Sequence, residues 1–240
     1  MLIALLSLTA LATAVLSGVF GMAGGMLLMG AYTALLPVAS AMVLHGATQL
    51  VANSGRALIL WRHIYVRGFC YYVAGALCAF ALVSRLRYVP EPAVVFLGLG
   101  LVPFIAALLP AQALDFERPG AAFLCGVQVA SVQMLAGAAG PLLDVAFVRT
   151  RLSRTQVVAT KAITQVFSHS LKLVYFASFG LSRELSAPLL GSILVATVAG
   201  TLLGTRILER LTDDTFRRWS RHIVYATGAF YLCKACATLL

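Results

Sequence analysis

The sequence predicts an all-α integral membrane protein that crosses the bilayer several times. Of its 240 residues, 61% are hydrophobic and 11% are charged, whereas soluble domains are nearer half apolar and a quarter charged. The mean hydropathy is +0.94. Apolar runs near 20 residues, the length that spans a bilayer as a helix, recur along the whole chain. A soluble fold of this size could not bury so much apolar surface, so the predicted environment is a membrane.

The apolar runs predict about eight helical segments in one membrane domain. They lie at about 2–20, 25–36, 39–61, 66–83, 92–110, 119–136, 155–179, 185–206 and 221–240, with a shorter run at about 140–148. The count is eight because we treat the first segment of each half of the chain as one helix broken at glycines. The polar stretches between the runs, the longest of which is 206–221, are too short for a soluble domain.

The charge is strongly basic, with 18 Lys and Arg against 8 Asp and Glu. Such a balance in a soluble protein indicates nucleic-acid binding. Here most arginines lie in short gaps between apolar runs, where they anchor cytoplasmic loops. We therefore predict a multi-pass protein of the cytoplasmic membrane whose partner is the lipid bilayer, with no nucleic-acid partner.

An internal repeat emerges when the sequence is shifted by 116 residues against itself. The motif Gly21-Met-Ala-Gly24 then falls on Gly137-Ala-Ala-Gly140. Polar positions coincide at the same offset: His45 with Lys161, Thr48-Gln49 with Thr164-Gln165, Asn53-Ser54 with His169-Ser170, and Arg56 with Lys172. We predict two pseudo-symmetric transmembrane repeats, 1–110 and 111–240, each with a broken first segment followed by three helices.

The glycine breaks predict a cavity inside the membrane. Helix breaks at Gly21, Gly24 and Gly25, and again at Gly137 and Gly140, free backbone groups that are tolerated at membrane depth only when buried in protein or lining a cavity. Matching breaks in two repeats are typical of secondary transporters. Close helix packing through small residues is the alternative, and the matched pair favours the cavity.

The direction of the repeats depends on whether the broken segments cross the membrane. If each returns to the side from which it entered, eleven Lys and Arg residues share one face and four take the other. Full crossing also gives an uneven division, so the positive-inside rule does not decide. The length of 1–36 favours re-entrant breaks and inverted repeats.

Two predicted helices carry polar stripes. His45, Gln49, Asn53 and Arg56 recur at helical spacing, and Lys161, Gln165, Ser168 or His169, and Lys172 repeat the pattern, with Thr48 and Thr164 beside them. A charged side chain at the bilayer centre costs roughly 2.5–3.5 kcal/mol on insertion scales, so it faces an interior. Lys161 is the expected functional cation, because Arg56 and Lys172 lie where they could also extend to the interface.

The acidic residues do not balance these cations. Seven of the eight acids fall in or beside predicted loops, and only Asp144 could lie deep, either paired with Lys161 or beside Arg149. A bound anion would compensate the remaining charge, helped by helix N-termini at the breaks. The predicted substrate-binding residues are Lys161, Arg56, His45, Thr48, Gln49, Asn53, Thr164, Gln165, His169 and Lys172.

Two of these side chains also predict a link to protons. His45 and His169 titrate near neutral pH in water, so together with Asp144 they are candidates for proton coupling. The alternative is that each histidine is a hydrogen-bonded packing residue.

The chain resembles the TauE/SafE family of sulfite exporters. The resemblance is carried by Gly18-Val-Phe-Gly21-Met-Ala-Gly24-Gly25, by Pro37 and the polar helix after it, and by the repeated half from Gly137 to Lys172. It implies a transporter of eight segments that exports or exchanges sulfite or organosulfonate anions, coupled to the proton gradient. Two departures concern the substrate: Met26-Leu-Leu-Met29 follows the first break in place of a richer glycine cluster with a nearby proline, and His45-Gly-Ala-Thr48 stands where small hydroxyl residues are common.

Other classes fit the sequence less well. A passive anion channel is the nearest alternative. A membrane enzyme would need a motif such as HExxH or GxSxG, and neither occurs. Cys233-Lys-Ala-Cys236 suggests a redox helper, and His45 with His169 a haem carrier, but helix packing accounts for both pairs. We expect no enzyme activity, no cofactor and no metal, a small anion as partner, and a sequence compatible with a homodimer.

Overall fold

The structure is a bundle of helices with the properties of a multi-pass membrane protein. The computed structural model describes residues 1–20, 23–109, 115–180, 185–208, 210 and 213–239. All regular elements in these ranges are helical. Four of the helices, Leu2–Phe20, Val66–Leu86, Pro119–Ala136 and Ala187–Ile207, are long and apolar enough to cross a membrane by length and composition. The predicted all-α class is therefore confirmed.

The helices follow the predicted apolar runs closely. They are α1 (Leu2–Phe20), α2 (Ala23–Leu35), α3 (Val38–Ile59), the 3-10 turn η1 (Trp61–His63), α4 (Val66–Leu86), α5 (Pro92–Leu108), α6 (Pro119–Ala136), α7 (Gly140–Phe147), α8 (Arg154–Ala177), α9 (Ala187–Leu208) and α10 (Asp213–Leu239). Prolines start α5 and α6, because a proline in the first helical turn loses no hydrogen bond. A capping box between Ser153 and Gln156 starts α8.

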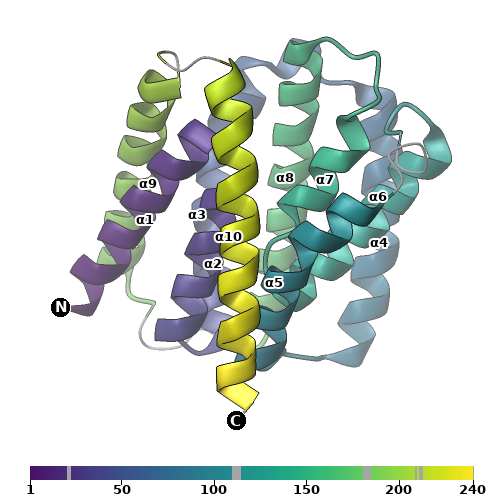
Figure 1. Ribbon diagram of the computed structural model, residues 1–240. Coiled ribbons are helices and arrows are strands. Elements are labelled where there is room, and N and C mark those ends of the chain that lie inside the picture. Colours follow the sequence, from purple (N-terminus) through teal and green to yellow (C-terminus); the bar gives the residue numbers. More distant parts are fainter. Residues whose placement is uncertain (21–22, 110–114, 181–184, 209, 211–212, 240) are drawn as a thin grey trace.

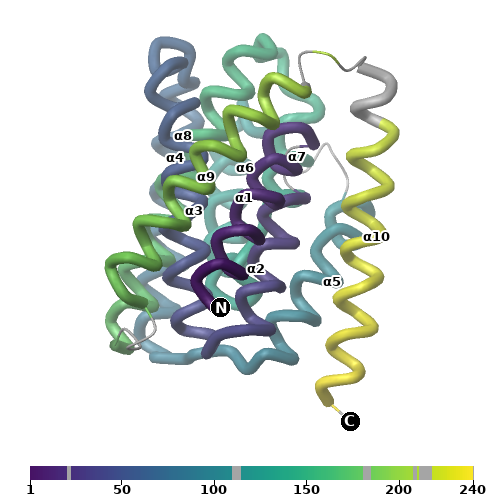
Figure 2. The backbone as a smooth tube through the Cα atoms, turned by 90° about the vertical axis from the view of Figure 1, so that its left-hand side faces the viewer, coloured from purple at the N-terminus to yellow at the C-terminus, as the bar shows by residue number. Residues whose placement is uncertain are grey.

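Helices far apart in sequence form the main packing pairs. The most extensive contacts are α1 with α9, α4 with α6, α3 with α8, and α5 with α10. Figure 2 shows α10 beside α5 at one edge of the bundle. In Figure 1 the α3–α4 and α7–α8 connections and the start of α10 lie at the upper end, while the α2–α3 and α4–α5 connections lie at the lower end.

Glycines bring two of these pairs into backbone contact, as small residues do in membrane bundles. A Cβ atom on Gly18 of α1 would lie 2.9 Å from the Cα of Gly204 in α9. A Cβ on Gly75 of α4 would overlap the carbonyl oxygen of Phe123 in α6. Gly191, which the 116-residue shift matches to Gly75, has no atom within 4 Å of such a Cβ. Gly75 therefore permits close helix packing, whereas the space around Gly191 is open, so the two matched glycines have different structural roles.

The second helix break is seen directly. Gly137 ends α6 in the left-handed region, with φ of 78°, which favours glycine, and α7 starts at Gly140. At the first break α1 ends at Phe20 and α2 starts at Ala23; Gly21 lies outside the described residues. Gly24 has no room for a Cβ, which would overlap Ser17 of α1.

Candidate functional site

The polar stripes predicted on two helices face each other at the middle of the bundle. They belong to α3 and α8, which form one of the main packing pairs. Gly46 of α3 faces α8 at this interface, where a Cβ would make an ordinary contact with the carbonyl oxygen of His169 at 3.5 Å. Seven of the ten predicted binding residues are buried at this interface and beside it: His45, Thr48, Gln49, Asn53, Thr164, His169 and Lys172.

Lys172 lies at the centre of this interface with none of its surface exposed. Its Nζ donates a hydrogen bond to Nδ1 of His45 at 2.6 Å and another to the carbonyl oxygen of Gly137 at 2.8 Å. Nε2 of His45 lies 2.9 Å from the carbonyl oxygen of Gly25. One chain of hydrogen bonds therefore joins the start of α2, just after the first break, to the glycine of the second break.

The partners of His45 determine its tautomer. A backbone carbonyl only accepts hydrogen bonds, so Nε2, which contacts Gly25, carries the hydrogen. A lysine ammonium only donates, so Nδ1 is the acceptor for Lys172. When the Lys172 amine is protonated, His45 is therefore neutral and the pair holds a single positive charge.

A second polar group lies beside this pair. The ring centroids of His169 and His45 are 5.5 Å apart, and Nε2 of Gln133 lies 3.0 Å from Nε2 of His169 and 3.1 Å from its Nδ1. Oε1 of Gln133 is buried without a hydrogen-bond partner. Gln133 is not among the residues predicted from the sequence; the available signal was a lone amide in the last turn before the Gly137 break. Beyond it, the hydroxyls of Tyr72 and Ser168 are 2.6 Å apart.

The charge of Lys172 is not balanced by a nearby carboxylate. Within the described ranges the ion pairs are Arg118 with Asp115, at 3.6 Å, and Lys161 with Asp144. Asp144, the one acid that the sequence placed deep, is therefore the partner of Lys161. Burying an ammonium group costs several kcal/mol unless it is paired. Both groups that contact Lys172 are neutral, so an ammonium group here would be a positive charge without a charged partner.

Lys161 lies in a different environment. Its side chain is 25% exposed and that of Asp144 is 44% exposed, so water screens their attraction. Eleven residues of α8 separate Lys161 from Lys172, which is roughly 16 Å along a helix axis. The two lysines therefore cannot bind the same small anion.

Of the other predicted binding residues, some form hydrogen bonds within their own helices and others are half-buried. Thr48 and Thr164 donate their hydroxyl hydrogens to carbonyl oxygens of their own helices, and Asn53 donates to the carbonyl oxygen of Gln49 at 2.8 Å. Arg56 is half-buried and no ion pair to it is found in the part of the chain that the structure describes. Gln165 is half-buried on α8.

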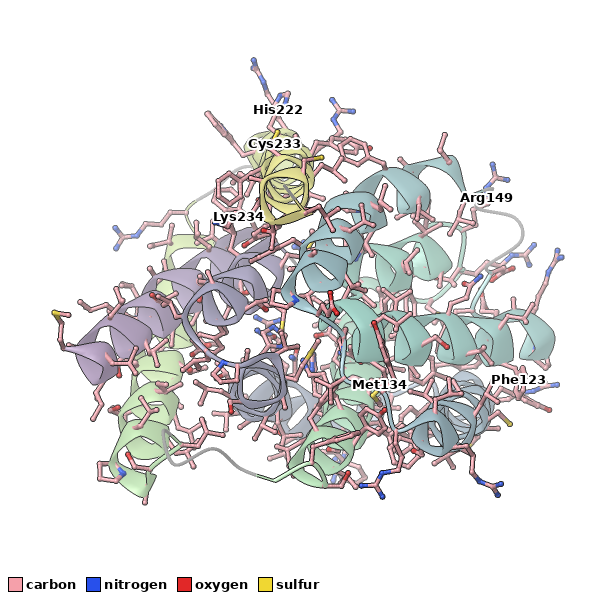
Figure 3. The ribbon with its side chains drawn as sticks, turned by 90° about the horizontal axis from the view of Figure 1, so that it is seen from below. Phe123, Met134, Arg149, His222, Cys233 and Lys234 are labelled. Atoms are coloured by element: carbon pink, nitrogen blue, oxygen red, sulfur yellow. The ribbon has the colours of Figure 1, made fainter. Side chains whose placement is uncertain are left out.

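Two short helices start beside this centre. The carbonyl oxygen of Gly25, just after the first break, contacts His45, and that of Gly137, at the second break, contacts Lys172. Helix α2 begins at Ala23 and helix α7 at Gly140. The first N–H groups of a helix lack intrahelical partners and carry partial positive charge. Figure 3 shows that Met134 of α6 lies inside the bundle, whereas Arg149 and His222 extend from its outer edge. Each helix therefore starts within three residues of a backbone carbonyl that contacts the pair.

The chain matches a known protein family. Residues 6–231 match the model of the sulfite exporter TauE/SafE family, which is nearly the whole chain. No curated protein and no solved structure matches the chain.

Proposed function

The chain belongs to the sulfite exporter TauE/SafE family, and on this premise we propose that it exports sulfite or a small organosulfonate through a site centred on Lys172. Membership of this family makes it a multi-pass membrane transporter. The identity of the anion, the residues that bind it and the coupling to protons are the proposal.

The observation that carries the proposal is that Lys172 is fully buried and has no carboxylate partner within the described ranges. An ammonium group has three N–H donors, and two of them bond to His45 and Gly137. An anion would accept the third hydrogen bond and compensate a charge that costs several kcal/mol when it is buried alone. The N–H groups at the starts of α2 and α7 would add partial positive charge on the same side.

The geometry favours Lys172 over Lys161 as the principal cation. Asp144 already compensates Lys161, and both groups are partly exposed. Arg56, which is half-buried without an ion pair in the described ranges, is the second cation of the path. Gln133 is added to the predicted set because its buried Oε1 is free to accept a hydrogen bond from a water or from a protonated anion.

Two inverted repeats, 1–110 and 111–240, are proposed as the architecture. The packing pairs support them: α1 with α9 corresponds to α6 with α4, while α3 with α8 and α5 with α10 pair like with like. Counting α1 with α2, and α6 with α7, as broken segments gives eight segments. Most arginines belong to connections at the upper end of Figure 1, next to η1, α8 and α10, so we assign that end to the cytoplasm.

Proton coupling is proposed to act through His45. Because His45 accepts the hydrogen bond from Lys172, a proton added to Nδ1 would remove that bond and place a second charge beside the first. An anion between the breaks would stabilise the doubly charged state, so anion and proton would bind together. Movement of both keeps the net charge transferred small.

Transport by purified protein in liposomes tests the proposal. Liposomes loaded with radiolabelled sulfite should lose it faster when sulfite is present outside, because a carrier exchanges its substrate and a channel does not. Lys172→Met should abolish the exchange. Lys161→Met, which removes the other lysine of α8, should retain it. Full exchange in Lys172→Met would overturn the assignment, and release unaffected by external sulfite would favour the channel.

A further inference from the structure

A half-open cavity lies at the other end of α8, between the last turns of α4 and α8. Its volume is about 170 Å³, and it is lined by Phe80, Ser84, Arg87, Val174, Tyr175, Ser178 and Phe179. We propose that this cavity is a second anion site, on the face opposite the arginine-rich end, which binds a small organic anion by its charged head and its alkyl tail. The inference rests on the proposed function, because it takes the anion to be a transported one.

The charged head would bind to Arg87 and Ser84. The guanidinium of Arg87 lies 5.8 Å from the centroid of the Phe179 ring, and no acid of the described chain forms an ion pair with it. The hydroxyl of Ser84 is buried and has no hydrogen-bond partner, although a serine in a helix commonly bonds to the carbonyl four residues earlier. The cavity thus holds a free cation and a free hydroxyl donor.

The backbone of Arg87 is held in an unusual conformation. Its φ is 46°, and no other non-glycine residue in the described ranges has a positive φ. That conformation is unfavourable for a residue with a Cβ. Glycine commonly ends a helix in this way without that cost. An arginine at this position is explained by the cavity, which its side chain lines.

The remaining walls are apolar and would contact an alkyl tail. Phe80 packs edge-on against Tyr175 with ring centroids 6.4 Å apart, and Phe179 lies 5.2 Å from Tyr175. Sulfite has no carbon to cover this surface. Each methylene removed from water contributes about 0.8 kcal/mol, which is about fourfold in affinity. The site therefore selects short alkanesulfonates over inorganic oxyanions.

Tyr175 lines the cavity and lies between Lys172 and Ser178 along α8. It follows Lys172 by one turn of α8 and is buried. Its hydroxyl accepts a hydrogen bond from the N–H of Tyr88 at 2.9 Å and donates one to the carbonyl oxygen of Tyr88 at 2.8 Å. Lys172 and Ser178 are roughly 9 Å apart along the helix axis. An anion that moves between the two sites would have to displace the Tyr175 side chain.

Calorimetric binding to the full-length protein in detergent tests the second site. The Lys172→Met variant removes the proposed central site, so the heat reports the cavity alone. In that background, affinity should rise about fourfold from methanesulfonate to ethanesulfonate and again to propanesulfonate. Arg87→Gln should weaken ethanesulfonate binding about tenfold or more. Arg87→Lys, which retains the charge, should lose less.

The matched control is Arg85→Gln, which removes an exposed arginine of the same turn that does not line the cavity. It should leave the affinity within about twofold. Equal affinities in the Arg85→Gln and Arg87→Gln variants, or no binding in the Lys172→Met background, would overturn the second site. Sulfite exchange by the wild type is measured in parallel. If sulfite is exchanged but binding does not depend on Arg87, the proposed function is supported and the second site is refuted. If binding depends on Arg87 but sulfite is not exchanged, the second site is supported and the proposed function is refuted.

Discussion

Replacing Lys172 with methionine should remove anion binding at the central site without unfolding the protein. The change leaves the carbonyl oxygen of Gly137 and Nδ1 of His45 without a donor, and each buried unsatisfied acceptor costs about 1–3 kcal/mol. It also removes a fully buried ammonium, whose burial costs several kcal/mol. The two effects are of similar size, so the stability without anion should change little.

The variant and the wild type should differ in how much an added anion raises the melting temperature. A ligand at a hundredfold excess over its Kd stabilises the folded state by about 2.7 kcal/mol, which raises the melting temperature of a chain of this size by roughly 5–10 °C. Thermal unfolding in detergent, with the inorganic anions sulfite, sulfate, phosphate and chloride, should give this rise in the wild type for the sulfur oxyanions. Lys172→Met should give none.

Lys161→Met is the control for this experiment. Its ion pair with Asp144 is partly exposed and is worth at most about 1 kcal/mol, so the variant should keep the full rise. Two results would refute the reasoning. One is an equal rise in Lys172→Met and the wild type. The other is a much lower melting temperature of Lys172→Met without anion, which would mean that the protein itself already balances the charge.

Three further predictions concern the breaks, the packing and the proton. Gly137→Ala places a Cβ at positive φ and against the side chain of Met29, so it should lower stability by about 1–3 kcal/mol in thermal unfolding; unchanged stability would contradict the close contact at the break. Gly75→Ala should also lower the melting temperature, because its Cβ meets backbone of α6, whereas Gly55→Ala, with open space around it, should be neutral or slightly stabilising. His45→Gln should retain anion binding but lose the dependence of sulfite efflux on an imposed pH gradient, and retained dependence would exclude His45 as the proton carrier.

Much of the fold was predictable because hydropathy and proline positions determine where membrane helices lie. The runs at 92–110 and 119–136 coincide with α5 and α6, since prolines start both helices. The last helix was predicted from 221 but begins at Asp213. The earlier start was not predicted because the first residues of this helix are polar, and a search for apolar runs does not detect a polar helix end.

The candidate site was predictable only as a pair of helix faces. Helical spacing correctly selected residues that meet at the α3–α8 interface, among them His45 and Lys172. Spacing cannot determine which cation has a counterion, because Asp144 reaches Lys161 from a different helix. Gln133 was missed for the same reason. It lies on α6, and residue spacing along α8 cannot indicate a neighbour on another helix.

The backbone contact between α1 and α9 has a consequence for synthesis of the protein. The glycine face of α1 is complete as soon as residue 20 has been made, but the face that it packs against, around Gly200 and Gly204, is made about 180 residues later. At a translation rate of 5–20 residues per second this delay is about 10–40 s. During that time α1 stands in the bilayer without its partner. The small-residue face of α1 therefore has to remain without its native partner until α9 has been made.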